Sequence, residues 1–188
     1  ARARKVGGEM LGMVPSTLAR PSPHTPSRLH AVRRQVGDPF GDVDQGPQVN
    51  QSQFDKVMRY IGLGKTEGAR LLTGGGRHGS TGYYVQPTVF ADVTDEMTIA
   101  REEIFGPVIS VYEKQDMDDA IVQANCLPFA FQASVFSNDY TEIMNAINGL
   151  DGSAIMVNEN SAFRVDWMPF AGRKRSGLGI GGIAHTLE

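Results

Sequence analysis

Cysteine and tryptophan are nearly absent from this chain, which has one residue of each among 188. A single cysteine cannot form an internal disulfide, so a secreted scaffold held together by disulfides is excluded and a reducing, cytoplasmic location is expected. Long hydrophobic runs are also missing, because no stretch of about 18 apolar residues, the length that spans a bilayer, occurs in the sequence. We therefore expect no membrane-spanning helix.

An excess of positive charge is missing as well. The formal net charge is −3, so the chain lacks the basic character by which proteins bind nucleic acids, and no nucleic-acid partner is expected. Hydrophobic residues make up 40% and charged residues 21% of the sequence. These values are close to globular averages, and the length suffices for one sizeable core.

The N-terminal segment differs in composition from the rest of the chain. Residues 1–36 hold seven basic residues and one acidic residue. They show no sustained helical or strand period, and they are interrupted by Pro15, Pro21, Pro23 and Pro26. We expect residues 1–35 to be weakly ordered and residues 36–188 to form the folded body. The arginine-rich, acid-poor composition also fits an organelle transit peptide, although no clear amphipathic helix supports that alternative.

Hydrophobic periodicity beyond residue 50 alternates between helical and strand patterns. Helices are predicted over residues 51–69, 94–100, 116–125 and 139–147, and strands over residues 70–73, 83–90, 107–112, 132–136 and 153–158. Short strands that alternate with helices of about ten residues are typical of crossover units. The sequence therefore predicts an α/β fold with a parallel, Rossmann-like sheet, followed by a long loop after residue 158.

Two glycine-containing stretches imitate phosphate-binding loops. Gly64 begins a Gly-Lys-Thr sequence, but the phosphate-loop motif needs another glycine five residues earlier, where Arg59 stands. Lys65 is therefore predicted to be a solvated helix residue. The four glycines within residues 177–182 follow no predicted strand, so we interpret that stretch as a flexible connector.

The stretch EEIFGPV at residues 102–108 carries the clearest functional signal. A Gly-Pro pair ends regular structure, so Glu103 and Phe105 are predicted to lie on a turn that feeds a buried strand. Turns beside parallel strands are where α/β proteins bind ligands. A carboxylate there can accept hydrogen bonds from paired ribose hydroxyls, and an aromatic ring can pack against a flat heterocycle. The alternative is a surface loop with a solvated acid.

Further motifs surround this stretch in a fixed order. GYYVQPTVF occupies residues 82–90, MPFAG residues 168–172 and SGLG residues 176–179. Together with EEIFGPV, they make the chain from about residue 36 to its end resemble the C-terminal part of the catalytic domain of aldehyde dehydrogenases. The resemblance implies an NAD or NADP cofactor and the oxidation of a small aldehyde to a carboxylic acid, and it does not distinguish the two cofactors.

Several residue roles are implied by the same resemblance. Glu103 matches the glutamate that binds the nicotinamide-ribose hydroxyls, and Phe105 matches the aromatic residue that positions the nicotinamide. Phe170 matches a phenylalanine near the substrate pocket. Asn158 matches an asparagine in the loop under that pocket, where a structural role is expected.

The stretch FRVDWMPFAG at residues 163–172 is more particular. It resembles a subgroup that handles small, often phosphorylated or phosphonate aldehydes. On this reading, Arg164 forms part of the substrate pocket and offers a bidentate partner to an anionic group. A structural ion pair between Arg164 and Asp166 is the alternative.

No residue of this chain matches the family's catalytic nucleophile or its general base, which the resemblance places upstream of the residues present. Cys126 falls in a helix-to-loop segment, where a packing role is expected. No metal site is predicted. We therefore expect a truncated protein that is inactive alone and whose own cofactor binding is doubtful. A thiol-dependent enzyme that pairs Cys126 with a histidine has no supporting spacing to any candidate, namely His24, His30, His78 or His185.

A non-catalytic role is the competing hypothesis. The chain would keep the family's scaffold and pair with full-length aldehyde dehydrogenase subunits in a homo- or hetero-oligomer. The resemblance also implies that the family continues beyond residue 188 into a strand that joins a neighbouring subunit. Without that strand, an unpaired sheet edge should weaken assembly.

Overall fold

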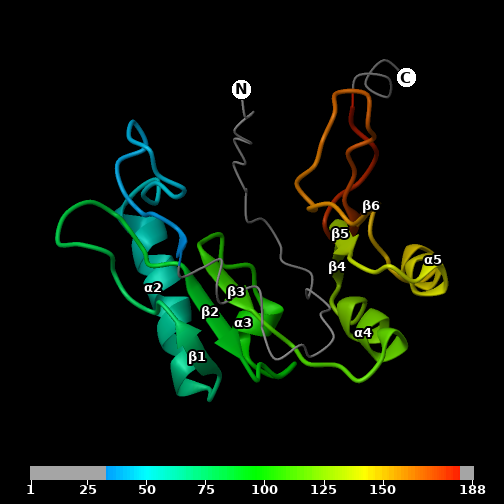
Figure 1. The fold of residues 1–188 in the computed structure, drawn as a ribbon, viewed down its shortest axis with the longest axis horizontal. Coiled ribbons are helices and arrows are strands. Elements are labelled where there is room, and N and C mark those ends of the chain that lie inside the picture. Colours follow the sequence, from blue (N-terminus) through cyan, green and yellow to red (C-terminus); the bar gives the residue numbers. More distant parts are fainter. Residues whose placement is uncertain (1–32, 183–188) are drawn as a thin grey trace.

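The computed structural model of the chain describes residues 33–182 (Figure 1). Helices and strands alternate along it, which confirms the predicted α/β class. Most of the basic N-terminal segment lies outside the described residues, so neither its predicted weak order nor the transit-peptide alternative is tested. Three of the four histidines considered as partners of Cys126 also lie outside them. The division at residue 36 therefore stays a prediction.

Helix α2 (Gln51–Thr66) begins at a side-chain cap. The side chain of Asn50 accepts a hydrogen bond from the backbone N–H of Gln53, which satisfies one of the unpaired donors at the helix start. Beyond the helix, Gly68 adopts a left-handed φ of 99°, as at many helix ends. The buried residues recur every three or four positions and form one apolar face: Phe54, Val57, Tyr60, Ile61 and Gly64. The helix predicted over residues 51–69 is confirmed except at its end.

A three-stranded sheet packs against α2. Its strands, in spatial order, are β1 (Arg70–Thr73), β2 (Thr88–Ala91) and β3 (Val108–Ser110). The expected parallel pairing joins β2 and β3, whereas β1 adds an antiparallel edge. All of β2 is buried, and a Cβ atom on Gly64 would lie 3.2 Å from the ring of Phe90. Helix α3 (Thr98–Arg101) connects β2 to β3.

Two predicted elements begin later than expected, and the strand predicted over residues 107–112 is shortened to β3. The strand predicted over residues 83–90 is reduced to β2. Pro87 has no N–H for a strand ladder, and Val85 pairs instead with Arg77 in an isolated bridge. The helix predicted over residues 94–100 begins later, at α3, and its N-terminus has no side-chain cap.

The second half of the chain contributes a further set of strands and helices. In chain order these are α4 (Met117–Ala124), β4 (Phe129–Ala130), β5 (Gln132–Val135), α5 (Tyr140–Gly149), β6 (Ala154–Val157) and β7 (Arg173–Lys174). β5 and β6 pair in parallel, and β4 and β7 pair antiparallel. The side chains of Asp116 and Asp139 accept backbone hydrogen bonds at the starts of α4 and α5. Both predicted start points are confirmed.

Each half has its own hydrophobic core, and Figure 1 shows the two groups of elements on either side of the segment that joins β3 to α4. The first core lies between α2 and the β1–β3 sheet and includes Val57, Ile61 and Phe90. The second is smaller, lies among α4, α5, β5 and β6, and includes Val135 and Ala146. The distance between a side chain on one half and a side chain on the other is therefore set by the contact between the two halves.

Strand β7 lies where the sequence predicted only a loop. It pairs with β4 through contacts distant in sequence. The Nζ of Lys174 donates hydrogen bonds to the carbonyl oxygens of Asn125 (2.7 Å) and Leu127 (3.3 Å) and forms an ion pair with Asp151 at 2.8 Å. These long-range contacts hold β7 in place, and a local hydrophobic period does not reveal them.

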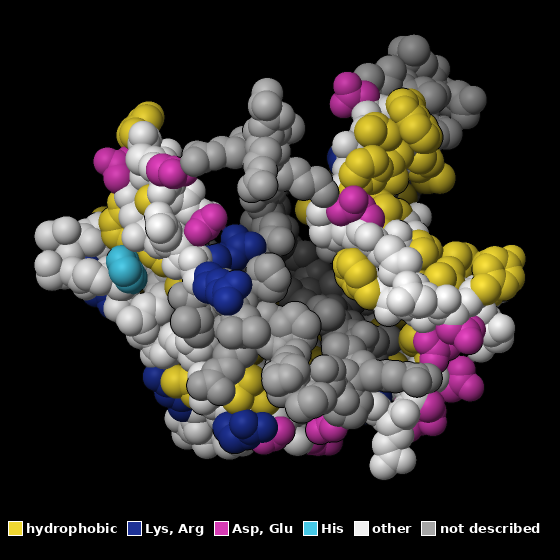
Figure 2. Space-filling model, viewed as in Figure 1, with side chains coloured by type: hydrophobic (Ala, Val, Ile, Leu, Met, Phe, Trp, Pro, Cys, Tyr) yellow, Lys and Arg dark blue, Asp and Glu magenta, His cyan; other side chains and the backbone are white. Residues whose placement is uncertain are grey.

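Large hydrophobic side chains remain exposed beyond β6. Figure 2 shows such side chains gathered over the loop between β6 and β7 and over α5. Trp167 is 74% exposed and Leu178 is fully exposed. In the part of the chain that the structure describes, no helix has the length and apolar character needed to cross a bilayer.

Candidate functional site

The turn at residues 102–106 leaves α3 and enters β3. Ile104 points into the first core and is 8% exposed, whereas Phe105 is 58% exposed. Phe105 has a φ of 55°, in the left-handed region that non-glycine residues seldom occupy. The carbonyl oxygen of Pro107 accepts a 2.8 Å hydrogen bond from the N–H of Thr88, which joins the turn to the sheet. The predicted turn is confirmed, but the strand after it lies at the edge of its sheet, and only Val108 of its three residues is buried.

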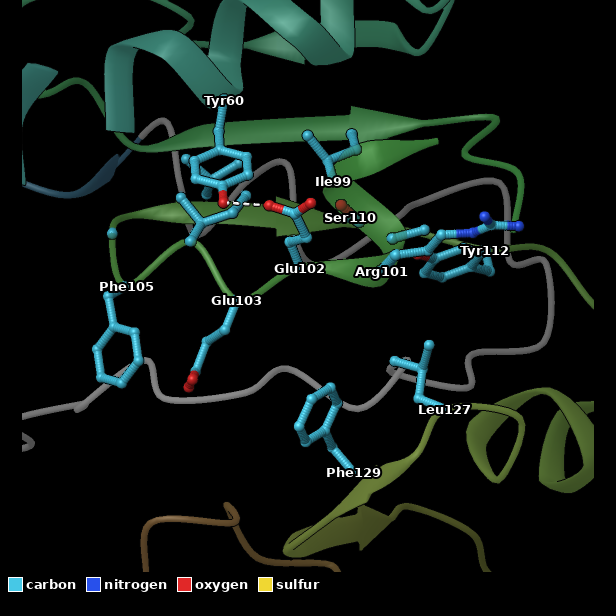
Figure 3. A pocket seen from close by; sticks show the side chains of 14 residues that line it. Tyr60, Ile99, Arg101, Glu102, Glu103, Phe105, Ser110, Tyr112, Leu127 and Phe129 are labelled. Carbon is cyan, nitrogen blue, oxygen red and sulfur yellow. Dashed lines mark hydrogen bonds between the residues drawn. The ribbon is translucent and has the colours of Figure 1, made fainter. Parts of the chain in front are cut away.

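A cavity of about 370 Å³ runs beside β3, which is an edge strand of its sheet. Glu103 and Phe105 lie at one end of it and Tyr112 at the other, and Leu127 and Phe129 form part of the facing wall. Figure 3 shows Glu103 and Phe105 extending away from α2, on the side of the sheet where Leu127 and Phe129 lie. The cavity therefore lies between the two halves of the chain.

The turn does not lie at the end of its strand where α/β proteins usually bind ligands. Ligands in α/β proteins usually bind at the carboxyl ends of parallel strands, but the turn of residues 102–106 lies at the amino end of β3. The cavity extends along the whole strand and reaches Tyr112 beyond its carboxyl end. The candidate site is thus a groove along an edge strand rather than a pocket at a strand end.

Two tyrosines that the sequence analysis did not single out also line the cavity. The hydroxyl of Tyr60 donates a 2.6 Å hydrogen bond to Oε2 of Glu102, and this bond, together with burial, raises the pKa of Tyr60 above its usual value. Burial raises the pKa of Tyr112 to about 12, with smaller contributions from the charges of Asp95 and Cys126. Both hydroxyls remain protonated at neutral pH, and that of Tyr60 donates its single proton to Glu102.

The two predicted substrate-pocket residues lie together but outside this cavity. The guanidinium carbon of Arg164 is 4.4 Å from the ring centroid of Phe170. That ring also packs edge-on against Phe131 at 5.0 Å between centroids. An ion pair between Arg164 and Asp166, the alternative considered from the sequence, is not formed among residues 33–182. Neither Arg164 nor Phe170 contributes to the cavity wall beside β3.

Cys126 follows the end of α4, in the predicted helix-to-loop segment, but it is exposed, so the packing role expected of it is wrong. The chain leaves α4 at Asn125 and turns outward, and the N–H of Cys126 donates to the carbonyl oxygen of Gln123 at 3.1 Å. The next residue, Leu127, lines the cavity, but Cys126 does not. Across residues 33–182, no cluster of three or more His, Cys, Asp or Glu side chains is arranged to hold a metal ion.

Two other residues singled out from the sequence serve the structure itself. Lys65 is an exposed residue of α2, as predicted, and its Nζ also donates a 2.6 Å hydrogen bond to the carbonyl oxygen of Gly75, so it supports the glycine turn after β1. Asn158 has the structural role expected of it. Its side chain exchanges two 3.0 Å hydrogen bonds with the backbone of Ser137, which links the ends of β5 and β6.

A groove with a carboxylate and an aromatic ring at one end and tyrosine hydroxyls along it is typical of a small-molecule site in an α/β protein. The sequence family described as the aldehyde dehydrogenase family matches residues 27–188. The chain therefore belongs to the aldehyde dehydrogenase family.

Individual relatives agree with this assignment. An aldehyde dehydrogenase from Aspergillus niger is 45% identical over 159 residues, which cover 84% of this chain and 32% of the relative. A betaine aldehyde dehydrogenase from Rhizobium etli is 47% identical over 157 residues, which cover 81% of this chain and 32% of the relative. The chain thus spans about a third of the length of the curated relatives it matches.

Solved structures show the same fold. The NAD⁺ complex of the aldehyde dehydrogenase from Bacillus cereus matches with a TM-score of 0.81 and 34% identity, over 85% of this chain and 32% of that one. Lactaldehyde dehydrogenase from Escherichia coli matches with a TM-score of 0.80 and 31% identity, over 85% of this chain and 34% of that one. The described part of the chain therefore has the fold of the corresponding third of these enzymes.

Proposed function

We propose that this chain is the C-terminal part of the catalytic domain of an aldehyde dehydrogenase and supplies one wall of its nicotinamide pocket. The parent reaction is the NAD(P)⁺-dependent oxidation of an aldehyde to a carboxylic acid. One observation carries the proposal: Glu103 and Phe105, two residues apart on one turn, line the same cavity.

The residues present fit a nicotinamide ribose. Glu103 is half-buried, so its carboxylate can accept hydrogen bonds from paired hydroxyls where water competes less. Phe105 is 58% exposed and offers its ring to a flat heterocycle. A bound nicotinamide would supply the hydride acceptor of the reaction. We assign Glu103 to hold the ribose hydroxyls and Phe105 to position the nicotinamide.

The chain alone is proposed to be inactive toward aldehydes. Oxidation requires a thiolate to attack the carbonyl and a base to activate water. Cys126 is exposed at the end of α4 and does not line the cavity, so it is poorly placed to be that thiolate. The resemblance to the family places the nucleophile and the base upstream of these residues. Cofactor binding by this chain is therefore expected to be weak.

A titration with nicotinamide mononucleotide, which carries the ribose without the adenosine half, tests the cofactor assignment. We expect weak binding, with changes in amide NMR shifts centred on residues 102–106. Glu103→Gln should weaken binding about tenfold, because hydrogen bonds to a charged group contribute about 1.5 kcal/mol or more. Glu113→Gln removes an exposed acid outside the cavity and should change nothing. Equal effects of the two variants would refute the assignment.

A dehydrogenase assay tests the proposed inactivity. The chain is incubated with NAD⁺ or NADP⁺ and several aldehydes, and NADH or NADPH formation is followed by absorbance. We expect no turnover above the background without protein. Turnover that Cys126→Ala abolishes would overturn the proposal, because it would make Cys126 the nucleophile.

The finer proposal concerns the substrate. We propose a small phosphorylated or phosphonate aldehyde, with Arg164 binding the anionic group. Support comes from the exposed guanidinium of Arg164, which lies over Phe170 and is not paired with Asp166. Betaine aldehyde, for which several relatives are named, is instead a cation. Methylphosphonate and choline are suitable probes: methylphosphonate should shift the Arg164 NMR signals, and choline should not. The reverse result would contradict the anionic class.

An interaction role is the second candidate, favoured by the exposed hydrophobic side chains of the loop between β6 and β7 and of α5 (Figure 2). In this role, the chain pairs with full-length aldehyde dehydrogenase subunits without catalysis. Mixing it with an intact homologue and measuring mass by native mass spectrometry tests the idea. A mixed species supports pairing, and its absence at micromolar concentrations counts against it.

A further inference from the structure

One face of helix α2 contacts the turn that carries Glu103 and Phe105. The contacting side chains are Gln53, Lys56, Val57 and Tyr60, which recur at the three- and four-residue spacing of a helix face. They reach successive residues of the turn from the helix side, as Figure 3 shows for Tyr60, which also lines the cavity. The conformation of the turn is therefore coupled to the position of α2.

Gln53 makes the most specific of these contacts. Its side-chain Nε2 donates hydrogen bonds to the carbonyl oxygen of Phe105 at 2.6 Å and to that of Ile104 at 3.3 Å. A primary amide carries two N–H donors, so one nitrogen can serve both oxygens. The two carbonyls belong to the peptide groups on either side of the Phe105 Cα. Holding both restricts the backbone dihedrals of Phe105.

Phe105 needs such a restraint. Its φ of 55° lies in the left-handed region, which a non-glycine residue occupies only when surrounding contacts impose it. A change to an extended φ would turn the Phe105 ring and the preceding Glu103 relative to each other. The cavity would then lose the arrangement in which both side chains face the same space.

Tyr60 and Lys56 hold the turn at neighbouring points. The hydroxyl of Tyr60 donates to Glu102 at 2.6 Å and keeps that carboxylate turned toward α2, while Glu103 extends the opposite way (Figure 3). The Nζ of Lys56 lies 5.6 Å from the Phe105 ring centroid, within range of a cation–π contact. The turn is thus fixed at Glu102, Ile104 and Phe105 by a single helix.

We propose that Gln53 is a positioning residue, which acts through the backbone of Ile104 and Phe105 to hold Glu103 and Phe105 in the geometry that binds the nicotinamide ribose. The identity of the ligand rests on the proposed function. The claim that Gln53 holds the backbone of Phe105 does not depend on it. Gln53 itself acts through the turn rather than through contact with the ribose. Tyr60 supports the same turn from its N-terminal side.

The test uses two substitutions at Gln53 and two matched ones at Gln51. Gln53→Leu removes the donor, and Gln53→Glu replaces it with a carboxylate that repels the two carbonyl oxygens. Gln51 stands on the same helix, and its Nε2 donates to Asp55 at 2.6 Å, within α2. Gln51→Leu and Gln51→Glu therefore make the same chemical changes without touching the turn.

The first readout needs no ligand. A left-handed residue has a short distance between its own amide and α protons, which gives a strong NMR cross-peak for Phe105. We expect the full chain and both Gln51 variants to keep this signal, and both Gln53 variants to lose much of it while their core signals persist. If both Gln53 variants keep it, the inference is overturned, whatever the ligand proves to be.

The second readout is the affinity for nicotinamide mononucleotide. When the competent turn is less populated, apparent affinity falls in proportion. We expect about fivefold weaker binding in the Gln53 variants, as for the loss of one ordinary hydrogen bond, and no change in the Gln51 variants. Lost turn geometry with unchanged affinity would contradict the positioning role. If the unmodified chain shows no binding at the turn, the proposed function fails, while the first readout still decides whether Gln53 holds Phe105.

Discussion

Gly106 lies directly against Val57. A Cβ atom added to Gly106 would be 2.5 Å from Cγ2 and 2.9 Å from Cγ1 of Val57, closer than real side-chain contacts. Since Val57 is fully buried in α2, it has no space into which to move. The glycine therefore lets the backbone of the turn approach the helix closely enough for Gln53 to reach its carbonyl oxygens.

Gly106→Ala should lower the free energy of unfolding by about 1–3 kcal/mol, as overpacking of a filled core does. The control is Gly62→Ala, within the same helix and with nothing within 4 Å of an added Cβ, which should stabilise the chain by about 0.5–1 kcal/mol. Urea unfolding measures both. Adding Val57→Ala to Gly106→Ala should cost less than the sum of the two single changes. Simple additivity would mean that the clash is relieved elsewhere.

Tyr112 should make the fold sensitive to alkaline pH. Burial raises its pKa from 10.0 to about 12, so the neutral ring stabilises the fold fully below pH 10, and this contribution is lost as the pH rises toward 12. Two pKa units correspond to about 2.7 kcal/mol, which partial exposure reduces to about 1–2 kcal/mol. Tyr112→Phe should flatten the alkaline loss of stability measured by urea unfolding. Tyr140→Phe is the control, since that side chain is 75% exposed. An unchanged alkaline slope in Tyr112→Phe would show that the ring is not buried in solution.

Lys174→Met should loosen the attachment of β7. The hydrogen bond from Lys174 is the main cause of the lowered pKa of Asp151, and the same amine binds the carbonyl oxygens of Asn125 and Leu127. Because the folded pKa of Asp151 is depressed, its stabilising effect is present above about pH 4 and is lost as the pH falls through the folded value. In the variant, the Asp151 pKa measured by ¹³C NMR should rise and the unfolding temperature should fall by a few degrees. Arg173→Met, which removes only a minor influence on Asp151, should do less.

Local features of the sequence predicted most of the regular structure. The helices predicted to begin at Asp116 and Asp139 are α4 and α5, and in the structure both aspartate side chains accept hydrogen bonds from free backbone donors at the helix starts. The turn of residues 102–106 was predicted from its Gly-Pro pair. The family motifs then gave Glu103 and Phe105 their proposed roles, and both lie at the cavity.

Features that depend on contacts distant in sequence were not predicted. Strand β7 forms only because β4 lies beside it, and the facing wall of the cavity, Leu127 and Phe129, belongs to the other half of the chain. A partial signal existed for Tyr60, which belongs to the apolar face of α2, but its bond to Glu102 needs the turn in place. Cys126 was misjudged because its outward direction is set by the end of α4.

The groove beside β3 has its two walls on separately packed cores joined by the short link between β3 and α4. The width of the groove is therefore set by the contact between the two halves and not by the packing within either half. A molecule in the groove that contacts both Phe105 and Phe129 would therefore bind to both halves at once. A substitution that destabilises the smaller core would therefore change the groove, and with it the proposed ribose site, without any change to Glu103 itself.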